Sequence, residues 1–190
     1  HALLENNEHQ LTNQQKPFIL YVGSRKKYKN FEFFLKGYSL SSKLKNDFNI
    51  ILFGGGKLSN DEKKFIHELK LDDKVIYKEG NDKELYNLYR SSKAFIFPSL
   101  YEGFGLPLIE AMVHECPVIC SKNKIFEEIA GDAAEYFDPT NLENFKEKVE
   151  KTLYSSSKID ELKLLGKKIS QAYNWEKCTY ETLKIYEKFK

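Results

Sequence analysis

Cysteine is scarce in this chain, which excludes a disulfide framework and a cysteine-rich metal site. The 190 residues contain only three cysteines, and two of them, Cys116 and Cys120, lie at either end of a short apolar segment. Free cysteines in apolar surroundings are among the most buried side chains in proteins. We therefore expect buried thiols, no metal ion and a reducing, cytoplasmic compartment.

Long apolar runs and an excess of one charge are also missing. No segment approaches the roughly 20 apolar residues of a membrane-spanning helix, and no secretory signal pattern is visible. The 30 basic residues are balanced by 28 acidic ones, and their dispersion along the chain argues against nucleic-acid binding. A hydrophobic fraction of 41% in 190 residues is typical of one soluble globular domain with a core of its own.

Two common nucleotide-binding patterns are absent as well. No Gly-x-Gly-x-x-Gly fingerprint occurs, which argues against a nicotinamide or flavin cofactor. The run Gly54-Gly55-Gly56-Lys57 is not a P-loop, because that pattern needs a glycine at Ile51 and a hydroxyl at Leu58. This run is predicted to be a turn.

From Pro17 onward, apolar segments of strand length alternate with amphipathic segments of helix length. The predicted strands span 18–22, 49–53, 74–77, 94–97, 117–120 and 134–137, and the predicted helices lie near 30–44, 60–70, 82–91, 106–114 and 124–130. This alternation is typical of a parallel sheet covered on both faces. The predicted fold class is α/β, a doubly wound, Rossmann-like sheet of about six strands. Such sheets bind ligands at the carboxyl ends of their strands, so the candidate site loops follow Val22, Phe53, Tyr77 and Phe97.

The two ends of the chain depart from this alternation. Residues 1–16 are polar and rich in Asn and Gln, and we interpret them as a linker or a remnant of an absent N-terminal domain. From about Asn141, three helices without a further strand form a C-terminal extension. Asn174 is the expected N-cap of the last helix, which either packs on its own domain or stays partly exposed. Three of its side chains are expected to face inward: Trp175, Leu183 and Tyr186.

The segment 97–110 carries the most specific signal in the sequence. Two carboxylates, Glu102 and Glu110, are separated by seven residues, and Gly103 and Gly105 follow the first of them. Pro107 favours the first turn of a helix that begins between the two carboxylates. Glycines let a ligand approach the backbone, and a helix start presents free N–H groups to an anion. The segment therefore predicts an anion-binding loop with a carboxylate on each side to bind hydroxyl groups.

This pattern resembles the E-x7-E signature of the retaining GT-B glycosyltransferases of group 1, family GT4. The resemblance implies that residues 17–190 form a C-terminal, donor-binding domain, which is one half of a GT-B fold. It implies that Glu102 lies against the donor sugar near the reacting carbon and that Glu110 accepts hydrogen bonds from the ribose hydroxyls. The backbone amides of four residues would help to hold the diphosphate: Gly103, Phe104, Gly105 and Leu106.

A basic loop follows the first predicted strand, beginning with Gly23 and including Arg25 and Lys29. Cations at this position stabilise the negative charge that grows on a departing nucleoside diphosphate, and the resembling family uses Arg and Lys there in place of a metal. Lys29 matches the lysine of its Gly-x5-Lys pattern, and Arg25 lies one position away from its usual arginine. Arg25, Lys29 and Glu102 are therefore the expected catalytic residues, and Lys26 and Lys27 are expected to be solvated.

A loop after the third predicted strand, Glu79-Gly80-Asn81-Asp82, resembles the loop that contacts the nucleotide base in this family, so Gly80 is a candidate donor-binding residue. Asp82 fits the N-cap of the next helix equally well. The glycine-rich run at 54–57 likewise fits either a backbone passing near the donor or a plain turn.

The implied activity is transfer of a hexosyl group from a nucleotide-diphosphate sugar to an acceptor hydroxyl, in surface glycan or lipopolysaccharide biosynthesis, without cofactor or metal. A GT-B enzyme has two domains and 190 residues accommodate one, so the N-terminal, acceptor-binding domain is an expected partner. We expect the chain alone to bind donor weakly and to transfer no sugar. Membrane association at the inner face would depend on the missing domain.

Two alternatives stay open. One is a GT-B-like enzyme of different chemistry, although a nucleotide-sugar epimerase is not expected to need the pair Glu102 and Glu110, and a phosphorylase needs a pyridoxal-binding lysine context that is not visible. The other is a non-catalytic nucleotide-binding module of flavodoxin or response-regulator type. A response regulator needs acidic residues at the end of its first strand, where this chain has Arg25 and lysines.

Overall fold

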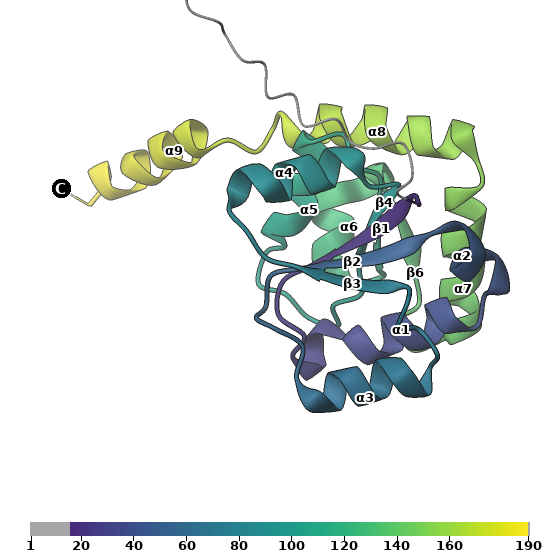
Figure 1. The fold of residues 1–190 in the computed structure, drawn as a ribbon. Helices are drawn as coiled ribbons and strands as arrows, with labels where there is room; N and C mark the ends of the chain where they lie inside the picture. Colours follow the sequence, from purple (N-terminus) through teal and green to yellow (C-terminus); the bar gives the residue numbers. More distant parts are fainter. Residues whose placement is uncertain (1–15, 190) are drawn as a thin grey trace, which may run out of the picture.

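Six parallel strands form one sheet in the computed structural model, which describes residues 16–189 (Figure 1). The strand order is β3-β2-β1-β4-β5-β6, and every neighbouring pair is parallel. This order starts at the centre of the sheet and runs outward first on one side and then on the other, which is the doubly wound topology. The strands are β1 (Phe18–Val22), β2 (Asn49–Phe53), β3 (Val75–Lys78), β4 (Ala94–Phe97), β5 (Val118–Ser121) and β6 (Ala134–Phe137).

Helices cover both faces of the sheet, as Figure 1 shows. One face carries α1 (Phe31–Ser39), α2 (Ser42–Asp47), α3 (Asn60–Glu68) and α7 (Leu142–Leu153). The other face carries α4 (Asp82–Ser91), α5 (Leu106–Val113), α6 (Lys124–Ala130) and α8 (Ser156–Ser170). Two short 3-10 helices, η1 (Lys27–Lys29) and η2 (Gly131–Ala133), interrupt the connecting loops. The predicted α/β class and Rossmann-like architecture are confirmed.

Alternate side chains of the central strands enter two separate cores, because successive residues of a strand point to opposite faces. On β1, Ile19 and Tyr21 pack with α1, α3 and α7, whereas Leu20 packs with α4, α5 and α6. All three are at most 2% exposed. A strand buried on both faces explains why these segments are nearly continuous apolar runs in the sequence.

The predicted boundaries hold for four strands, and the strands expected at 74–77 and 117–120 lie one residue later. The single helix expected at 30–44 is wrong, because the chain there forms α1 and α2. Ser41 separates them: its backbone is extended, and its hydroxyl accepts a hydrogen bond from the Leu44 amide at 3.0 Å. A serine at this position begins a new helix by capping it.

The C-terminal helix α9 (Trp175–Glu187) projects from the body of the domain (Figure 1). The Asn174 side chain accepts from the Lys177 amide at 2.7 Å, so the predicted N-cap is confirmed. The expectation that its apolar side chains turn inward is wrong, because Trp175, Leu183 and Tyr186 are 76%, 55% and 67% exposed. Residues 171–174 carry α9 away from α8, and no side chain of α9 is buried.

Three further predictions concern the cysteines and the chain ends. Cys116 and Cys120 are buried free thiols, as expected, and burial raises the pKa of both. Apart from Lys16, the linker expected at 1–16 lies outside the described residues. Within residues 16–189, no helix is both long enough and apolar enough to cross a membrane.

Candidate functional site

The candidate site lies at the carboxyl edge of the sheet, where the loops after β1, β2, β3 and β4 meet. Parallel strands bring these ends together regardless of their separation in the sequence. The first and last of the four loops are joined directly, because the Leu100 amide donates to the Tyr28 carbonyl at 2.8 Å. The first two are joined by the Gly23 amide, which donates to the Phe53 carbonyl at 2.9 Å.

Lys29 and Glu102 form an ion pair across this edge. The Lys29 Nζ lies 2.5 Å from Glu102 Oε1, and the two side chains are only 14% and 15% exposed. The ammonium also lies 5.3 Å from the centre of the Phe97 ring, a cation–π contact. The structure thus brings together two residues that are 73 positions apart in the sequence and were both expected to be catalytic.

The loop between Glu102 and α5 has the backbone that the sequence suggested. Gly105 is the N-cap of α5 with φ of 102°, a left-handed conformation that favours glycine, and Pro107 lies in the first turn. A Cβ on Gly103 would meet nothing within 4 Å, so the backbone there is open to a ligand. Phe104 and Leu106 are about half exposed. Free N–H groups at the start of α5 add a partial positive charge to this loop.

Glu110 lies in the second half of α5 and is held by a buried tyrosine. Tyr89 of α4 donates its hydroxyl to Glu110 Oε2 at 3.2 Å, and both burial and the neighbouring carboxylate raise the pKa of Tyr89. Within residues 16–189, Glu110 Oε1 has no hydrogen-bond partner. The carboxylate is therefore oriented through one oxygen, while the other can accept a further hydrogen bond. Tyr89 has no motif of its own and was not singled out from the sequence.

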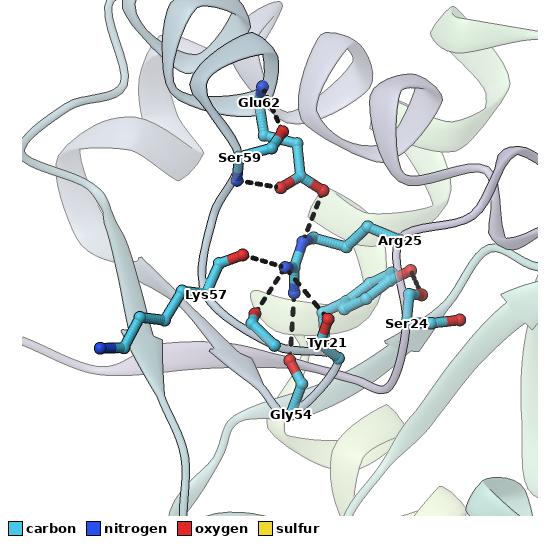
Figure 2. A network of polar contacts seen from close by, with 9 residues as sticks. Tyr21, Ser24, Arg25, Gly54, Lys57, Ser59 and Glu62 are labelled. Carbon is cyan, nitrogen blue, oxygen red and sulfur yellow. Dashed lines mark hydrogen bonds and ion pairs between the residues drawn. The ribbon is translucent and has the colours of Figure 1, made fainter.

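Arg25 points into the turn after β2 (Figure 2). Its guanidinium donates to the carbonyl oxygens of Gly54 at 3.0 Å, Gly56 at 2.6 Å and Lys57 at 3.2 Å. Its Nε donates to Glu62 Oε1 at 2.7 Å. Sequence reasoning missed this pairing, although the spacing Ser59-x-x-Glu62 is a helix-start signature that could have drawn attention to Glu62.

The helix that follows the β3 loop, α4, has a different N-cap from the one predicted. Asn81, and not Asp82, is the N-cap of α4, because its side chain accepts from the Glu84 amide and Glu84 accepts from the Asn81 amide. This reciprocal pair is a capping box, which satisfies two backbone donors and is therefore favoured over a cap one residue later. Gly80 precedes it and is exposed.

The comparisons with known proteins agree on one family. A family model described as "Glycosyl transferases group 1" matches residues 4–169. The chain belongs to the group 1 glycosyl transferases. Over 173 residues it is 30% identical to the O-antigen chain mannosyltransferase B of Escherichia coli, which corresponds to 90% of this chain and 45% of the relative. The chain therefore spans less than half the length of that glycosyltransferase.

Solved glycosyltransferases share its fold. An S. aureus TarM mutant in complex with Fondaparinux, alpha-GlcNAc-glycerol and UDP superposes with a TM-score of 0.79 and 19% identity, covering 91% of this chain and 36% of TarM. The C-terminal domain of a glycosyl transferase group 1 family protein (LpcC) from Francisella tularensis superposes with a TM-score of 0.71 and 22% identity. This match covers 82% of this chain and 85% of that one. The resemblance to one half of a GT-B glycosyltransferase is confirmed, and the flavodoxin and response-regulator alternatives are set aside.

Proposed function

We propose that this glycosyltransferase chain is the donor-binding half of a retaining enzyme that transfers a hexosyl group from a nucleotide-diphosphate sugar to an acceptor hydroxyl. The observation that carries the proposal is the Lys29–Glu102 pair, which lies beside the open Gly103–Gly105 loop and the start of α5. A cation, free amides and a carboxylate in one place suit a sugar diphosphate better than any neutral ligand.

The diphosphate is assigned to Lys29 and to the backbone at Gly103, Phe104, Gly105 and Leu106. A departing diphosphate gains negative charge, and an ammonium already in place stabilises that charge without reorganising. The start of α5 adds its free amides and dipole. In the structure Lys29 has Glu102 as its ion-pair partner, so binding would exchange the carboxylate for a phosphate oxygen.

The sugars of the donor are assigned to the two carboxylates. Glu110 presents a free oxygen beside the one held by Tyr89, and a carboxylate accepts both hydroxyls of a ribose diol. Glu102, released from Lys29, would lie against the hexose near its reacting carbon. The related mannosyltransferase acts on the O-antigen chain, by its name, which supports a surface glycan as the product. No observation favours the epimerase alternative.

A second domain is the expected partner. The chain covers 45% of the related mannosyltransferase, and the large apolar side chains of α9 are all more than half exposed. A groove of about 470 Å³ lies between the start of α5 and α9, with Phe104, Leu106 and Trp175 among its lining residues. A domain that covers α9 would also close the donor loop and bring the acceptor, so the chain alone should transfer no sugar.

Calorimetric titration with UDP, GDP and ADP tests the proposal. We expect one of the three to bind, and Glu110→Ala to weaken it by about 10-fold or more, because a hydrogen bond to a charged group contributes roughly 1.5–3 kcal/mol. Inorganic pyrophosphate has no ribose and should bind the variant as well as the wild type. The control is Glu115→Ala, which removes a 53% exposed carboxylate just beyond the same helix.

If the isolated chain binds none of the three, the titration is repeated with a full-length protein that contains both domains. Absence of binding there would refute a nucleotide donor. Unchanged affinity in Glu110→Ala would remove the ribose role, and sugar transfer by the isolated chain would refute the need for a second domain.

A further inference from the structure

Arg25 is engaged on every side by the protein itself (Figure 2). Four of its contacts go to backbone carbonyls at 54–57, and its Nε pairs with Glu62. The side chain is 4% exposed. A guanidinium in this state has little hydrogen-bonding capacity left, and a phosphate could reach it only after these contacts had opened.

The Gly54–Lys57 turn needs a hydrogen-bond donor at its centre, and Arg25 provides it. Gly54, Gly55 and Gly56 all have positive φ, of 75°, 73° and 81°, so the turn depends on three glycines in a conformation that L-residues avoid. Its carbonyl oxygens converge on one point, where their partial negative charges repel one another. A planar cation with several forked donors satisfies all of them at once, which an ammonium cannot do.

The same turn packs directly on the loop that leads to Lys29. A Cβ on Gly55 would collide with the carbonyl oxygen of Gly23 and come within 2.9 Å of the Ser24 Cα. The Gly54 amide is in turn held by the Lys78 carbonyl at 3.1 Å. The position of the first site loop is therefore set by backbone contact with the turn.

Glu62 fixes Arg25 from the other side. One Glu62 oxygen accepts from the Ser59 amide at 2.7 Å and the other from Arg25, so the capping box at the start of α3 orients the carboxylate. Contacts then run without a gap from α3 through Glu62 and Arg25 to the turn, and from the turn to Gly23.

We propose that Arg25 is a positioning residue for the donor site: together with Glu62 it fixes the Gly54–Lys57 turn under the loop that carries Lys29, and it does not touch the donor. This role rests on the proposed function of the site. It differs from the diphosphate contact expected for Arg25 from the sequence, which stays a prediction until the two are separated by experiment.

Glu62→Gln separates the two roles by the sign of its effect. If Arg25 binds the diphosphate, removing its competing anion frees the guanidinium and tightens binding. If Arg25 positions the turn, the same change loosens the turn and weakens binding by about 3- to 10-fold, comparable to the loss of one ordinary hydrogen bond between neutral groups. The measurement is the calorimetric dissociation constant for UDP, GDP and pyrophosphate in the complete protein, with Asp61→Asn on the adjacent exposed position as the matched control.

Arg25→Lys provides the second comparison, because it keeps the charge and removes the planar fork. We expect it to weaken binding as much as Arg25→Gln does. Rescue by lysine would show that charge alone matters and would overturn the proposal. A loss of stability alone raises the apparent dissociation constant only by the reciprocal of the folded fraction. Weaker binding that is fully accounted for by the folded fraction measured in urea denaturation would also overturn the proposal.

Hydrogen exchange measured without any ligand tests the positioning role of Arg25 and Glu62 independently of the donor. The Gly23 and Gly54 amides are hydrogen-bonded at the two sides of the turn, and we expect Arg25→Lys and Glu62→Gln to accelerate their hydrogen exchange by about 10-fold or more. Asp61→Asn should leave both rates unchanged. Equal exchange rates in all variants would overturn the proposal that Arg25 and Glu62 fix the turn. Failure of the wild-type protein to bind any nucleotide would instead refute the proposed function.

Discussion

Arg25 and Lys29 leave the same loop four residues apart, yet their surroundings differ in kind. Arg25 has a carboxylate and a ring of backbone carbonyls around a nearly inaccessible guanidinium. Lys29 has one carboxylate and the face of Phe97, and it reaches the surface beside the open glycine loop. The first cation would have to give up many contacts to bind a ligand, and the second would have to give up one. Two basic residues of one motif can therefore serve structure and chemistry separately.

The largest expected difference between the two residues is in how much each contributes to the free energy of unfolding. Arg25→Gln leaves Glu62 and several carbonyls without their shared donor, so we expect a loss of about 2–4 kcal/mol in the free energy of unfolding. Lys29→Gln breaks a largely buried pair that has fewer contacts, so it should cost less, about 1–2 kcal/mol. Urea denaturation of both variants measures the difference. Equal losses would break the comparison.

The next effect is on binding affinity, which should depend on Lys29 more than on Arg25. Lys29→Ala removes the expected diphosphate ligand, so pyrophosphate and nucleoside diphosphate should bind roughly 10- to 100-fold more weakly. Lys27→Ala, which removes an exposed lysine from the same loop, is the matched control and should change little. A loss of similar size in both variants would point to general charge attraction and not to a specific contact.

A smaller change is expected when the partner of Lys29 is neutralised. Glu102→Gln frees the ammonium from its ion pair, so pyrophosphate should bind a few-fold more tightly, whereas sugar transfer by a full-length protein should fall sharply. Glu115→Gln breaks an exposed ion pair with Lys167 and serves as the control. Weaker pyrophosphate binding in Glu102→Gln would mean that the carboxylate orients Lys29 and does not compete for it.

The smallest effect concerns the pH dependence of the Arg25 pair. Burial alone would raise the pKa of Glu62, but the hydrogen bonds from the Ser59 amide and Arg25 outweigh it and lower that pKa below its usual value near 4.5. A carboxylate with a lowered folded-state pKa stabilises the fold above its unfolded-state pKa, and this contribution disappears as the pH falls through the folded-state value.

The unfolding free energies of wild type and Glu62→Gln should therefore differ by a constant amount above about pH 5.5 and converge below about pH 4.5. Urea denaturation at several pH values measures this difference. A gap that stays constant into the acid range would show that the ionised carboxylate is not what stabilises the turn.

The sheet and the site edge could be predicted well, because both follow from local patterns in the sequence. Strands buried on both faces leave continuous apolar runs, and the segment from Phe97 to Glu110 combines glycines, a proline and two carboxylates at the spacing of one known family signature. The two catalytic candidates Lys29 and Glu102 could be placed near each other because each follows a central strand. The family and the half of a GT-B fold followed from the same residues.

What could not be predicted depends on choices between neighbouring polar residues and on distant contacts. The helix break at Ser41 and the choice of Asn81 over Asp82 as N-cap both depend on which side chain reaches a free backbone amide. The pairing of Arg25 with Glu62 joins positions 37 residues apart through a turn whose shape is fixed only in three dimensions. The outward apolar face of α9 has the same pattern as a packed helix, because a hydrophobic stripe does not reveal what covers it.

The exposed start of α9 offers a built-in optical probe. Trp175 is the only tryptophan in the chain and is 76% exposed, so its emission reports on the solvent around this one helix. If a second domain covers α9, as proposed above, the indole leaves water and its fluorescence shifts to shorter wavelengths. The assembly of the two halves could then be followed in solution without attaching any dye.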